Sequence, residues 1–198
     1  MDPSLTADAG APAPILALHG ISKRFPGVVA LDDVDFDLRA GEVHVLVGEN
    51  GAGKSTLVKI LSGIYQPDVG EILLDGQPVA LRDPHTAQQL GISTVHQELN
   101  LIPHLDVGRN IFLGREPLRA PAGIIDWPAV YRRSRQELAT LGIDLDPRTP
   151  VRRLGVAQQQ MTEIAKALVA RARVLILDEP TAAITADEAE LLFRTVDR

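Results

Sequence analysis

The chain carries, a quarter of the way along its length, the stretch Gly48-Glu49-Asn50-Gly51-Ala52-Gly53-Lys54-Ser55-Thr56. It fits the pattern of a phosphate-binding loop, in which two glycines separated by four residues precede a lysine and a hydroxyl residue. Glycine lets the backbone curl until consecutive N–H groups point into one hollow of anion size. Lys54 would place a positive charge near the β- and γ-phosphates, Ser55 would ligate Mg²⁺ through oxygen, and Thr56 would add a phosphate contact. The stretch predicts binding of a nucleoside triphosphate.

The residues on either side of this loop are typical of a strand and a helix. Val43-His44-Val45-Leu46-Val47 has the composition of a buried strand that runs into the loop. Leu57, Ile60 and Leu61 follow at helical spacing, and Gly63 is placed to end the helix. We therefore expect the loop at a helix N-terminus, where unpaired N–H groups and the helix dipole favour phosphate.

The composition is that of a soluble protein with one core. A chain of 198 residues with 45% hydrophobic and 23% charged residues is ordinary for a single domain. The sequence has neither an apolar run of about 18 residues nor a signal peptide, so a cytosolic location is expected. The absence of cysteine excludes disulfides and thiolate metal sites. A net charge of −6 with scattered arginines argues against a nucleic-acid partner.

The first part of the chain predicts an antiparallel β layer behind a disordered tail. Residues 1–14 are rich in Ala and Pro and have no apolar period, which is typical of disorder. Residues 15–38 are strand-like, with turns expected at Pro26-Gly27 and near Asp32-Asp33. Residues 71–76 are typical of a further strand and turn.

The middle of the chain is expected to form a helical subdomain over about residues 98–154, within one domain that spans 15–198. Asp126 can cap a helix that ends at Gly142 and packs one face on a core. That face would carry Val130, Tyr131, Ser134, Leu138 and Leu141. Another helix follows Gly155, and its core positions are Met161, Ile164, Ala165 and Leu168.

A short apolar strand at residues 174–177 ends in two carboxylates, Asp178 and Glu179. Strands that alternate with helices predict an α/β fold with a mainly parallel sheet, and ligands beyond the C-terminal ends of its strands. Asp178 is placed to hold Mg²⁺, directly or through water. Glu179 is placed to orient or deprotonate the water that attacks the γ-phosphate.

Four stretches in this order resemble the ABC-type ATPases, and most closely the ATP-binding subunits of bacterial importers of the ribose, galactose and arabinose type. They are GENGAGKSTL, HQELNLIPHLDVGRNIFLGRE, LGVAQQQMTEIAKAL and LILDEPTAAIT, and the resemblance covers about residues 18–198. It implies the P-loop NTPase fold: a RecA-like, mainly parallel sheet, an antiparallel β layer and a helical insertion. It also implies that this ABC-type nucleotide-binding domain uses ATP and Mg²⁺.

The resemblance assigns further site residues. Phe25 corresponds to the aromatic residue that stacks on adenine. Gln97 corresponds to the glutamine that approaches Mg²⁺ and the attacking water and relays the nucleotide state to the membrane partner. The signature, Leu154-Gly155-Val156-Ala157-Gln158, opens a helix that in the family faces the γ-phosphate of ATP held by another cassette. Gly155 replaces the usual serine and Ala157 the second glycine, which predicts a less active composite site. With Lys54 and Glu179, Gln97 forms the expected catalytic set.

The end of the chain departs from the family pattern. Thr185 stands where the family has an aspartate, although it still opens a capping box with Glu188. The family places a switch histidine one strand beyond Glu179, but all the histidines lie upstream: His19, His44, His85, His96 and His104. We therefore expect the sequence to be the N-terminal, C-terminally truncated part of a longer protein, with poor activity when isolated.

The function implied is ATP hydrolysis that drives sugar import. The implied partners are a second ATPase cassette in the same full-length chain, transmembrane permease subunits and, indirectly, a periplasmic sugar-binding protein, with this protein peripheral on the cytoplasmic face of the membrane. Two alternatives stay open: a non-transport ABC-type ATPase in translation or DNA repair, and a nucleotide-binding interaction module with negligible turnover. Residues 97–154 lack the sustained heptads of repair members, and a translation factor should be more basic. The sequence contains no Asn-Lys-x-Asp motif, which would indicate a preference for guanine nucleotides.

Overall fold

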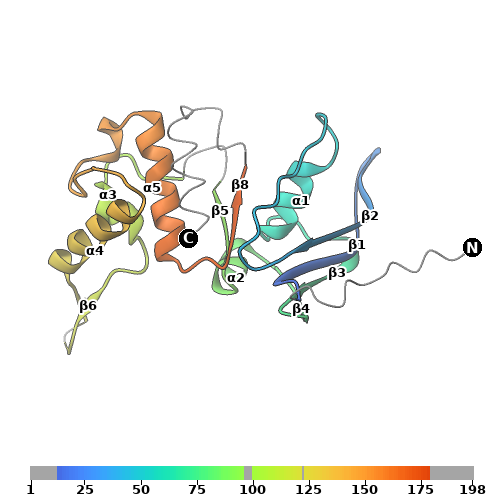
Figure 1. Ribbon diagram of the computed structural model, residues 1–198, viewed down its shortest axis with the longest axis horizontal. Coiled ribbons are helices and arrows are strands. Elements are labelled where there is room, and N and C mark those ends of the chain that lie inside the picture. Colours follow the sequence, from blue (N-terminus) through green and yellow to red (C-terminus); the bar gives the residue numbers. More distant parts are fainter. Residues whose placement is uncertain (1–12, 96–99, 122, 179–198) are drawn as a thin grey trace, which may run out of the picture.

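The structure is a computed structural model that describes residues 13–95, 100–121 and 123–178. A β layer with one helix lies on one side, a group of helices lies on the other, and two parallel strands lie between them (Figure 1). The tail predicted at residues 1–14 falls almost wholly outside the described residues. None of the helices in the described ranges has the length and apolar content needed to cross a bilayer.

The antiparallel β layer is a four-stranded sheet in the order β2-β1-β3-β4. Its strands are β1 (Leu16–Phe25), β2 (Val28–Leu38), β3 (Val69–Leu74) and β4 (Gln77–Val79). Gly27, with φ 79°, makes the turn between β1 and β2, and Asp75 and Gly76, with φ 50° and 72°, make the turn between β3 and β4. The β3–β4 turn has positive φ at both positions, which matches the twist of a hairpin. The predicted antiparallel layer and these two turns are confirmed.

The turn expected near Asp32-Asp33 is wrong, because both residues lie inside β2. Asp33 has φ 54°, and the register of β1 and β2 shifts between the pairs Ile21↔Val34 and Lys23↔Leu31. This is a bulge, in which one strand carries an extra residue without leaving the sheet. The Ser22 hydroxyl accepts a hydrogen bond from the Asp33 N–H at 2.9 Å, which satisfies a donor that the bulge removes from the ladder.

The strand expected at Val43–Val47 is also wrong, because residues 42–49 have no regular structure. Val45 and Val47 are 69% and 88% exposed. An apolar run forms a buried strand only where a neighbouring strand offers hydrogen-bond partners. In the described part of the chain the parallel sheet consists of β5 and β8 alone, and neither pairs with these residues.

Helix α1 (Lys54–Leu61) forms as predicted and packs on the β layer. Its buried residues Leu57, Ile60 and Leu61 join a core supplied by the inner faces of β1 and β3, with Leu16, Leu18, Ile21, Ile72 and Leu74. Gly63, with φ 74°, ends the helix. The short helix α2 (Pro84–Gln89) follows β4, and Asp83 caps it by accepting from the Thr86 N–H at 2.7 Å.

The helical part contains α3 (Val107–Ile111), α4 (Trp127–Thr140), the 3-10 turn η1 (Val151–Arg153) and α5 (Val156–Val169). Asp126 caps α4 as predicted, accepting from the Ala129 N–H at 3.1 Å. The helices share a second core, which includes Val107, Ile111, Val130, Leu138, Met161 and Ile164. Between α3 and α4 the chain forms a small hairpin that the sequence did not predict, β6 (Leu118–Arg119) and β7 (Ile124–Ile125).

The parallel strands β5 (Ile92–Val95) and β8 (Val174–Leu177) join the two sides. They pair over their whole length, from Ile92↔Val174 to Val95↔Leu177. Just before β8, the Arg173 guanidinium donates two hydrogen bonds, of 2.6 and 2.7 Å, to the carboxylate of Asp75 in the β3–β4 turn. This bidentate contact holds the pKa of Asp75 below its usual range, and it links the β layer to the parallel strands.

Candidate functional site: a phosphate-binding loop and the ends of the parallel strands

The phosphate-binding loop forms a tight curl directly before α1. Gly51 and Gly53 have φ 90° and 88°, values that side chains other than glycine rarely adopt. The Ala52 N–H donates to the Glu49 carbonyl at 3.1 Å, which closes the curl. Gly53 is the N-cap of α1, no side chain caps that end, and no acidic residue lies in its first turn. The first N–H groups of α1 therefore have no side-chain acceptor and favour an anion.

Lys54 lies within this curl. Its ammonium donates to the carbonyls of Gly48 and Glu49 at 2.6 and 3.0 Å. Both acceptors are neutral, so a charged phosphate oxygen would compete with them for the same ammonium. Ser55 is exposed and Thr56 half-buried in the first turn of the helix, next to the N–H groups that an anion would contact.

A larger residue would be tightly packed at Gly48 and would have no room at Gly53. A Cβ on Gly48 would lie 3.1 Å from the Ala52 Cβ. A Cβ on Gly53 would lie 2.6 Å from the Ala30 carbonyl oxygen and 2.7 Å from the Leu31 Cδ2. The end of the loop therefore rests directly on β2, and this contact holds it in place.

We expect Gly53→Ala to lose far more stability than Gly51→Ala. Both glycines have positive φ, which costs about 1–2 kcal/mol for another residue. Only the Gly53 substitution also drives a methyl group into the Ala30 backbone, since Gly51 has nothing within 4 Å of the added atom. Overpacking of this kind adds about 1–3 kcal/mol. Urea unfolding of the two variants measures the difference, and equal losses would mean that the loop is not seated on β2.

Phe25 ends β1 and is half-buried. Its ring centre lies 5.3 Å from that of Tyr65 in an edge-to-face arrangement, and the Lys23 ammonium lies 5.7 Å from the Phe25 ring centre. Phe25 pairs with Val28 across the β1–β2 turn, two residues before Ala30. Ala30 contacts Gly53, and two residues of strand span about 7 Å. Phe25 is thus paired with β2 two residues from the point where the phosphate-binding loop rests on that strand.

The ends of the two parallel strands bring Asp178 close to the segment of Gln97. The Asp178 N–H donates to the carbonyl of Val95, the last residue of β5, at 3.0 Å. Val95 is two residues before Gln97 in the chain. Gln97 itself and Glu179 lie outside the described residues. The described ranges contain no group of three or more His, Asp or Glu side chains that would hold a metal, but Mg²⁺ usually needs only one or two protein carboxylates.

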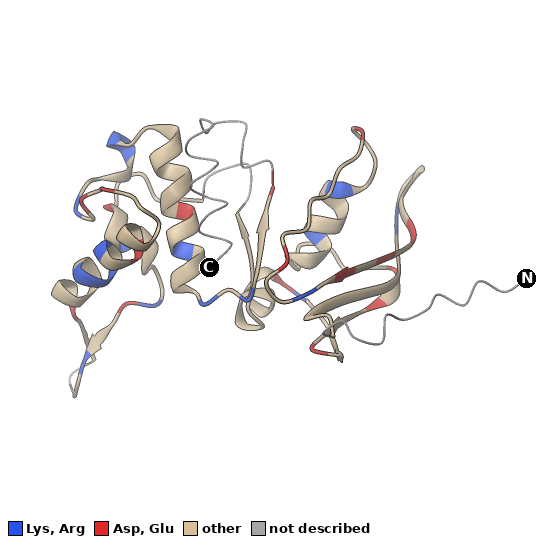
Figure 2. Ribbon diagram, in the orientation of Figure 1, with Lys and Arg blue, Asp and Glu red and all other residues tan. Residues whose placement is uncertain are grey.

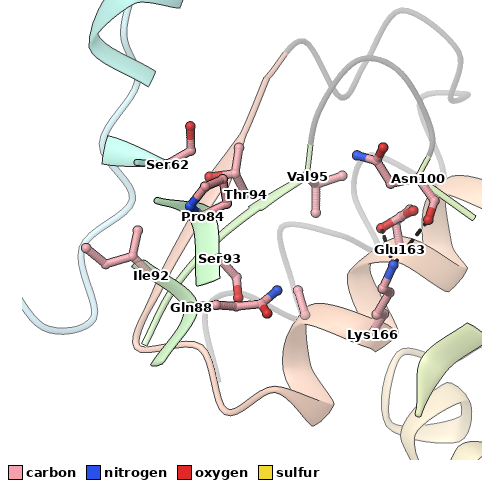
Figure 3. Close-up of a pocket in the computed structure, with 11 residues that line it drawn as sticks. Ser62, Pro84, Gln88, Ile92, Ser93, Thr94, Val95, Asn100, Glu163 and Lys166 are labelled. Carbon is pink, nitrogen blue, oxygen red and sulfur yellow. Dashed lines mark hydrogen bonds and ion pairs between the residues drawn. The ribbon is translucent and has the colours of Figure 1, made fainter. Parts of the chain in front are cut away.

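A partly open cavity of about 190 Å³ lies beside these strand ends, lined by residues of β5, α2 and α5 (Figure 3). In it, the Lys166 ammonium donates to the Asn100 carbonyl at 3.2 Å and lies 3.9 Å from the Glu163 carboxylate (Figure 3). Asn100 is three residues after Gln97. Helix α5 is therefore attached to the chain directly beyond Gln97.

The signature residues open α5. Gly155 is the N-cap, its N–H donates to the Gln158 side chain at 3.3 Å, and Val156 is 54% exposed. A Cβ at Gly155 would meet nothing within 4 Å, and its φ of −66° suits any residue. A serine side chain would therefore fit at this position, and its absence has no steric cause. Without it, the helix has half of a capping box.

The charges around the loop do not attract anions in general. Figure 2 shows acidic positions along the strands of the β layer and several basic positions on the helices of the other part. On β2 the acidic residues are Asp32, Asp33, Asp35 and Asp37, whereas α4 carries Arg132, Arg133 and Arg135. Exposed charges farther away than about 8 Å are screened at physiological ionic strength. The loop N–H groups and Lys54 are therefore the groups placed to attract a triphosphate directly.

The structure does not join the two halves of the predicted site. Within the described ranges, no hydrogen bond or ion pair connects residues 48–56 with Asp178. The reason is the same as for the missing strand, because residues 43–47, which would carry the loop to β8, are unpaired. Sequence reasoning also missed Tyr65 and the group of Glu163, Lys166 and Asn100. An aromatic residue just beyond the end of α1 was the available signal for Tyr65.

Comparison with known proteins gives the fold and the family. The profile of the family described as ABC transporter matches residues 31–182. A nucleotide-free ATP-binding cassette from an ABC transporter superposes with TM-score 0.80 at 24% identity, over 93% of this chain and 76% of that one. The cbiO1 protein of Clostridium perfringens, part of the ABC transporter complex cbiONQ, gives 0.76 at 27% identity, over 93% and 72%.

Curated relatives are more similar in sequence. The ribose import ATP-binding protein RbsA 1 of Rubrobacter xylanophilus is 62% identical over 93% of this chain. A putative ribose/galactose/methyl galactoside import ATP-binding protein of Burkholderia lata is 59% identical over 99% of it. The chain spans 37% and 38% of the length of these two relatives. With the family profile matched over most of its residues and the fold shared with solved cassettes, this chain belongs to the ABC transporter family.

Proposed function

We propose that the chain binds MgATP at residues 48–56 and forms part of an ATPase that drives the import of a sugar such as ribose or galactose. The observation that carries the proposal is the glycine curl at the uncapped N-terminus of α1, with the Lys54 ammonium held inside it at 2.6 and 3.0 Å from two carbonyls. Such a cradle fits the β- and γ-phosphates of a nucleotide.

The predicted site residues have different roles in binding ATP, holding Mg²⁺ and activating water. The N–H groups of the loop and Lys54 neutralise the phosphates, and Phe25 stacks on adenine. Ser55 and Asp178, with Gln97, would hold Mg²⁺, which supplies positive charge to the phosphate oxygens when bound. Glu179 orients a water and accepts its proton as the water oxygen bonds to the γ-phosphorus. The bond from that phosphorus to the bridging oxygen of ADP then breaks.

Hydrolysis also needs a signature helix from a second cassette. The exposed N-terminus of α5 at Gly155 and Val156 is suited to face a phosphate held by another cassette, by the same anion-binding principle as α1. The contact of α5 with Asn100 through Lys166 supports a route by which closure of the two cassettes around ATP would act on the segment of Gln97.

Sugar import is supported by the functions that the curated relatives carry in their names, ribose import and ribose/galactose/methyl galactoside import. The partners would be transmembrane permease subunits, a second cassette and, through the permease, a sugar-binding protein. The chain would lie on the cytoplasmic face of the membrane, attached through the permease. Mg²⁺ would accompany ATP.

Uptake and hydrolysis together test this function. In cells that lack the full-length protein, we expect loss of uptake of labelled ribose or galactose, restored by the wild type but not by Lys54→Ala. The purified full-length protein should hydrolyse ATP, whereas the turnover per chain of residues 1–198 alone should rise with protein concentration, because each composite site uses two cassettes. Uptake unchanged for every sugar tested, with ATP still hydrolysed, would favour a non-transport ATPase. Binding of ATP without turnover at any concentration would favour an interaction module.

A further inference from the structure

Tyr65 contacts the residue that we assign to adenine stacking. The Tyr65 and Phe25 ring centres are 5.3 Å apart with an interplanar angle of 64°. In this geometry the edge of one ring meets the face of the other, an arrangement that aromatic pairs prefer. The Lys59 ammonium lies 5.5 Å from the Tyr65 ring centre, on the same helix that the phosphate-binding loop opens.

The backbone of Tyr65 is fixed by the way α1 ends. The N–H groups of Ile64 and Tyr65 both donate to the Lys59 carbonyl, at 2.8 and 3.1 Å. Gly63, with φ 74°, makes this possible, and it packs against the Asp83 backbone with no room for a Cβ. A glycine C-cap of this kind sets the direction in which the chain leaves the helix. Tyr65 therefore has a defined position relative to α1.

The backbone beside Phe25 is fixed as well. The Asp68 carboxylate accepts from the Lys23 ammonium and from the Arg24 N–H, both at 2.7 Å. The Asp68 N–H in turn donates to the Ser22 carbonyl at 2.9 Å. These bonds hold the end of β1 but do not restrict rotation of the Phe25 side chain. Of the described aromatic rings, only that of Tyr65 contacts the Phe25 ring.

We propose that Tyr65 is a positioning residue that holds the Phe25 ring in the orientation needed to stack on adenine. Helix α1 then carries both recognition elements. The phosphate-binding loop at its start rests on β2 at Ala30, and Tyr65 beyond its end contacts Phe25. The inference rests on the proposed binding of ATP at residues 48–56 and extends it to a residue that acts through Phe25.

The test compares ATP with inorganic tripolyphosphate, which has the phosphates but no base, by titration calorimetry on the 198-residue chain. Tyr65→Ala is expected to weaken ATP binding by about threefold to tenfold, because this factor corresponds to the interaction free energy of an edge-to-face aromatic pair. It should leave tripolyphosphate binding unchanged. Tyr65→Phe keeps the ring and should bind ATP within about twofold of the wild type. Phe25→Ala should weaken ATP binding at least as much as Tyr65→Ala does. The double variant should weaken it no more than Phe25→Ala alone.

Two further variants separate positioning from general support of the fold. Tyr65→Leu keeps apolar volume without an aromatic ring, so it should remain folded and still show the loss specific to ATP. Tyr131→Ala removes the other tyrosine of the chain, on α4, and should leave both affinities unchanged. Thermal unfolding of each variant confirms that it is folded before titration.

Four results would overturn the inference, each in a recognisable way. Equal weakening of ATP and tripolyphosphate by Tyr65→Leu would show that Tyr65 supports α1 rather than the base platform. Additive losses in the double variant, or no loss in Phe25→Ala, would show that Tyr65 does not act through Phe25. Failure of the wild type to bind either ligand would overturn the proposed function together with this inference.

Discussion

Replacing Lys54 by alanine is expected to weaken MgATP binding by about 10- to 100-fold, which corresponds to the roughly 1.5–3 kcal/mol of a charge-assisted hydrogen bond. The ammonium is already held inside the curl by the carbonyls of Gly48 and Glu49, at 2.6 and 3.0 Å. Little side-chain ordering is therefore needed when phosphate replaces these acceptors. Titration of a fluorescent ATP analogue into both proteins measures the ratio of the two dissociation constants.

Lys59→Ala is the matched control for this prediction. It removes the same charge from the same helix, five residues farther from the loop. Its ammonium lies near the Tyr65 ring rather than near a loop carbonyl. We expect its affinity for ATP to stay within about fivefold of the wild type, the limit for an exposed cation–π contact. If Lys54→Ala binds ATP as tightly as Lys59→Ala does, the loop is not the triphosphate site.

Glu179→Gln in the full-length protein is expected to lower the turnover number by about 100-fold or more while ATP stays bound, because the amide keeps the shape of the side chain but cannot accept the proton of the attacking water. The cassettes should then remain closed around ATP. Steady-state phosphate release and retention of labelled ATP on the protein measure the two effects. Glu71→Gln, an exposed change on β3, should alter neither.

Turnover of Glu179→Gln at the wild-type rate would show that another group activates the water. Loss of ATP binding together with turnover would instead give Glu179 a structural role at the end of β8. Retention of ATP with loss of turnover is the only outcome that fits a residue acting on water alone.

Helices with clear ends were predicted best from the sequence. Asp126 caps α4, Gly63 follows the end of α1, and the apolar faces of α1, α4 and α5 are buried. These features depend on residues three or four apart in the chain, so local sequence contains them. The Asp75-Gly76 turn was predicted for the same reason, because both residues tolerate positive φ.

Features that depend on distant neighbours were predicted less well. The apolar run at residues 43–47 indicated burial, yet Val47 is 88% exposed because no described strand pairs with that run. Asp32-Asp33 has the composition of a turn, but the same preference for unusual φ also suits a bulge. The β6–β7 hairpin has strands of two residues, too short to give an alternating pattern.

In the candidate site, too, features that depend on nearby residues were predicted and contacts between distant residues were not. The composition of residues 48–56 indicated the glycine curl and the helix start, and the structure has both. The contact of Tyr65 with Phe25 joins residues forty positions apart, and that of Lys166 with Asn100 joins residues 66 positions apart. Neither contact has a local pattern. The assignments of Phe25, Gln97, Asp178, Glu179 and the signature to catalysis or binding stay predictions.

The central claim is that ATP binds with its phosphates on the loop at residues 48–56 and its base beside Phe25 and Tyr65. Photolabelling with 8-azido-ATP, followed by trypsin digestion and mass spectrometry, tests it most directly. Cleavage after the basic residues would release fragments 25–39 and 60–82, which carry Phe25 and Tyr65 respectively. We predict label on one or both fragments, removed by excess ATP and reduced in Lys54→Ala. Label confined to the helical part, or label that excess ATP does not remove, would contradict the account.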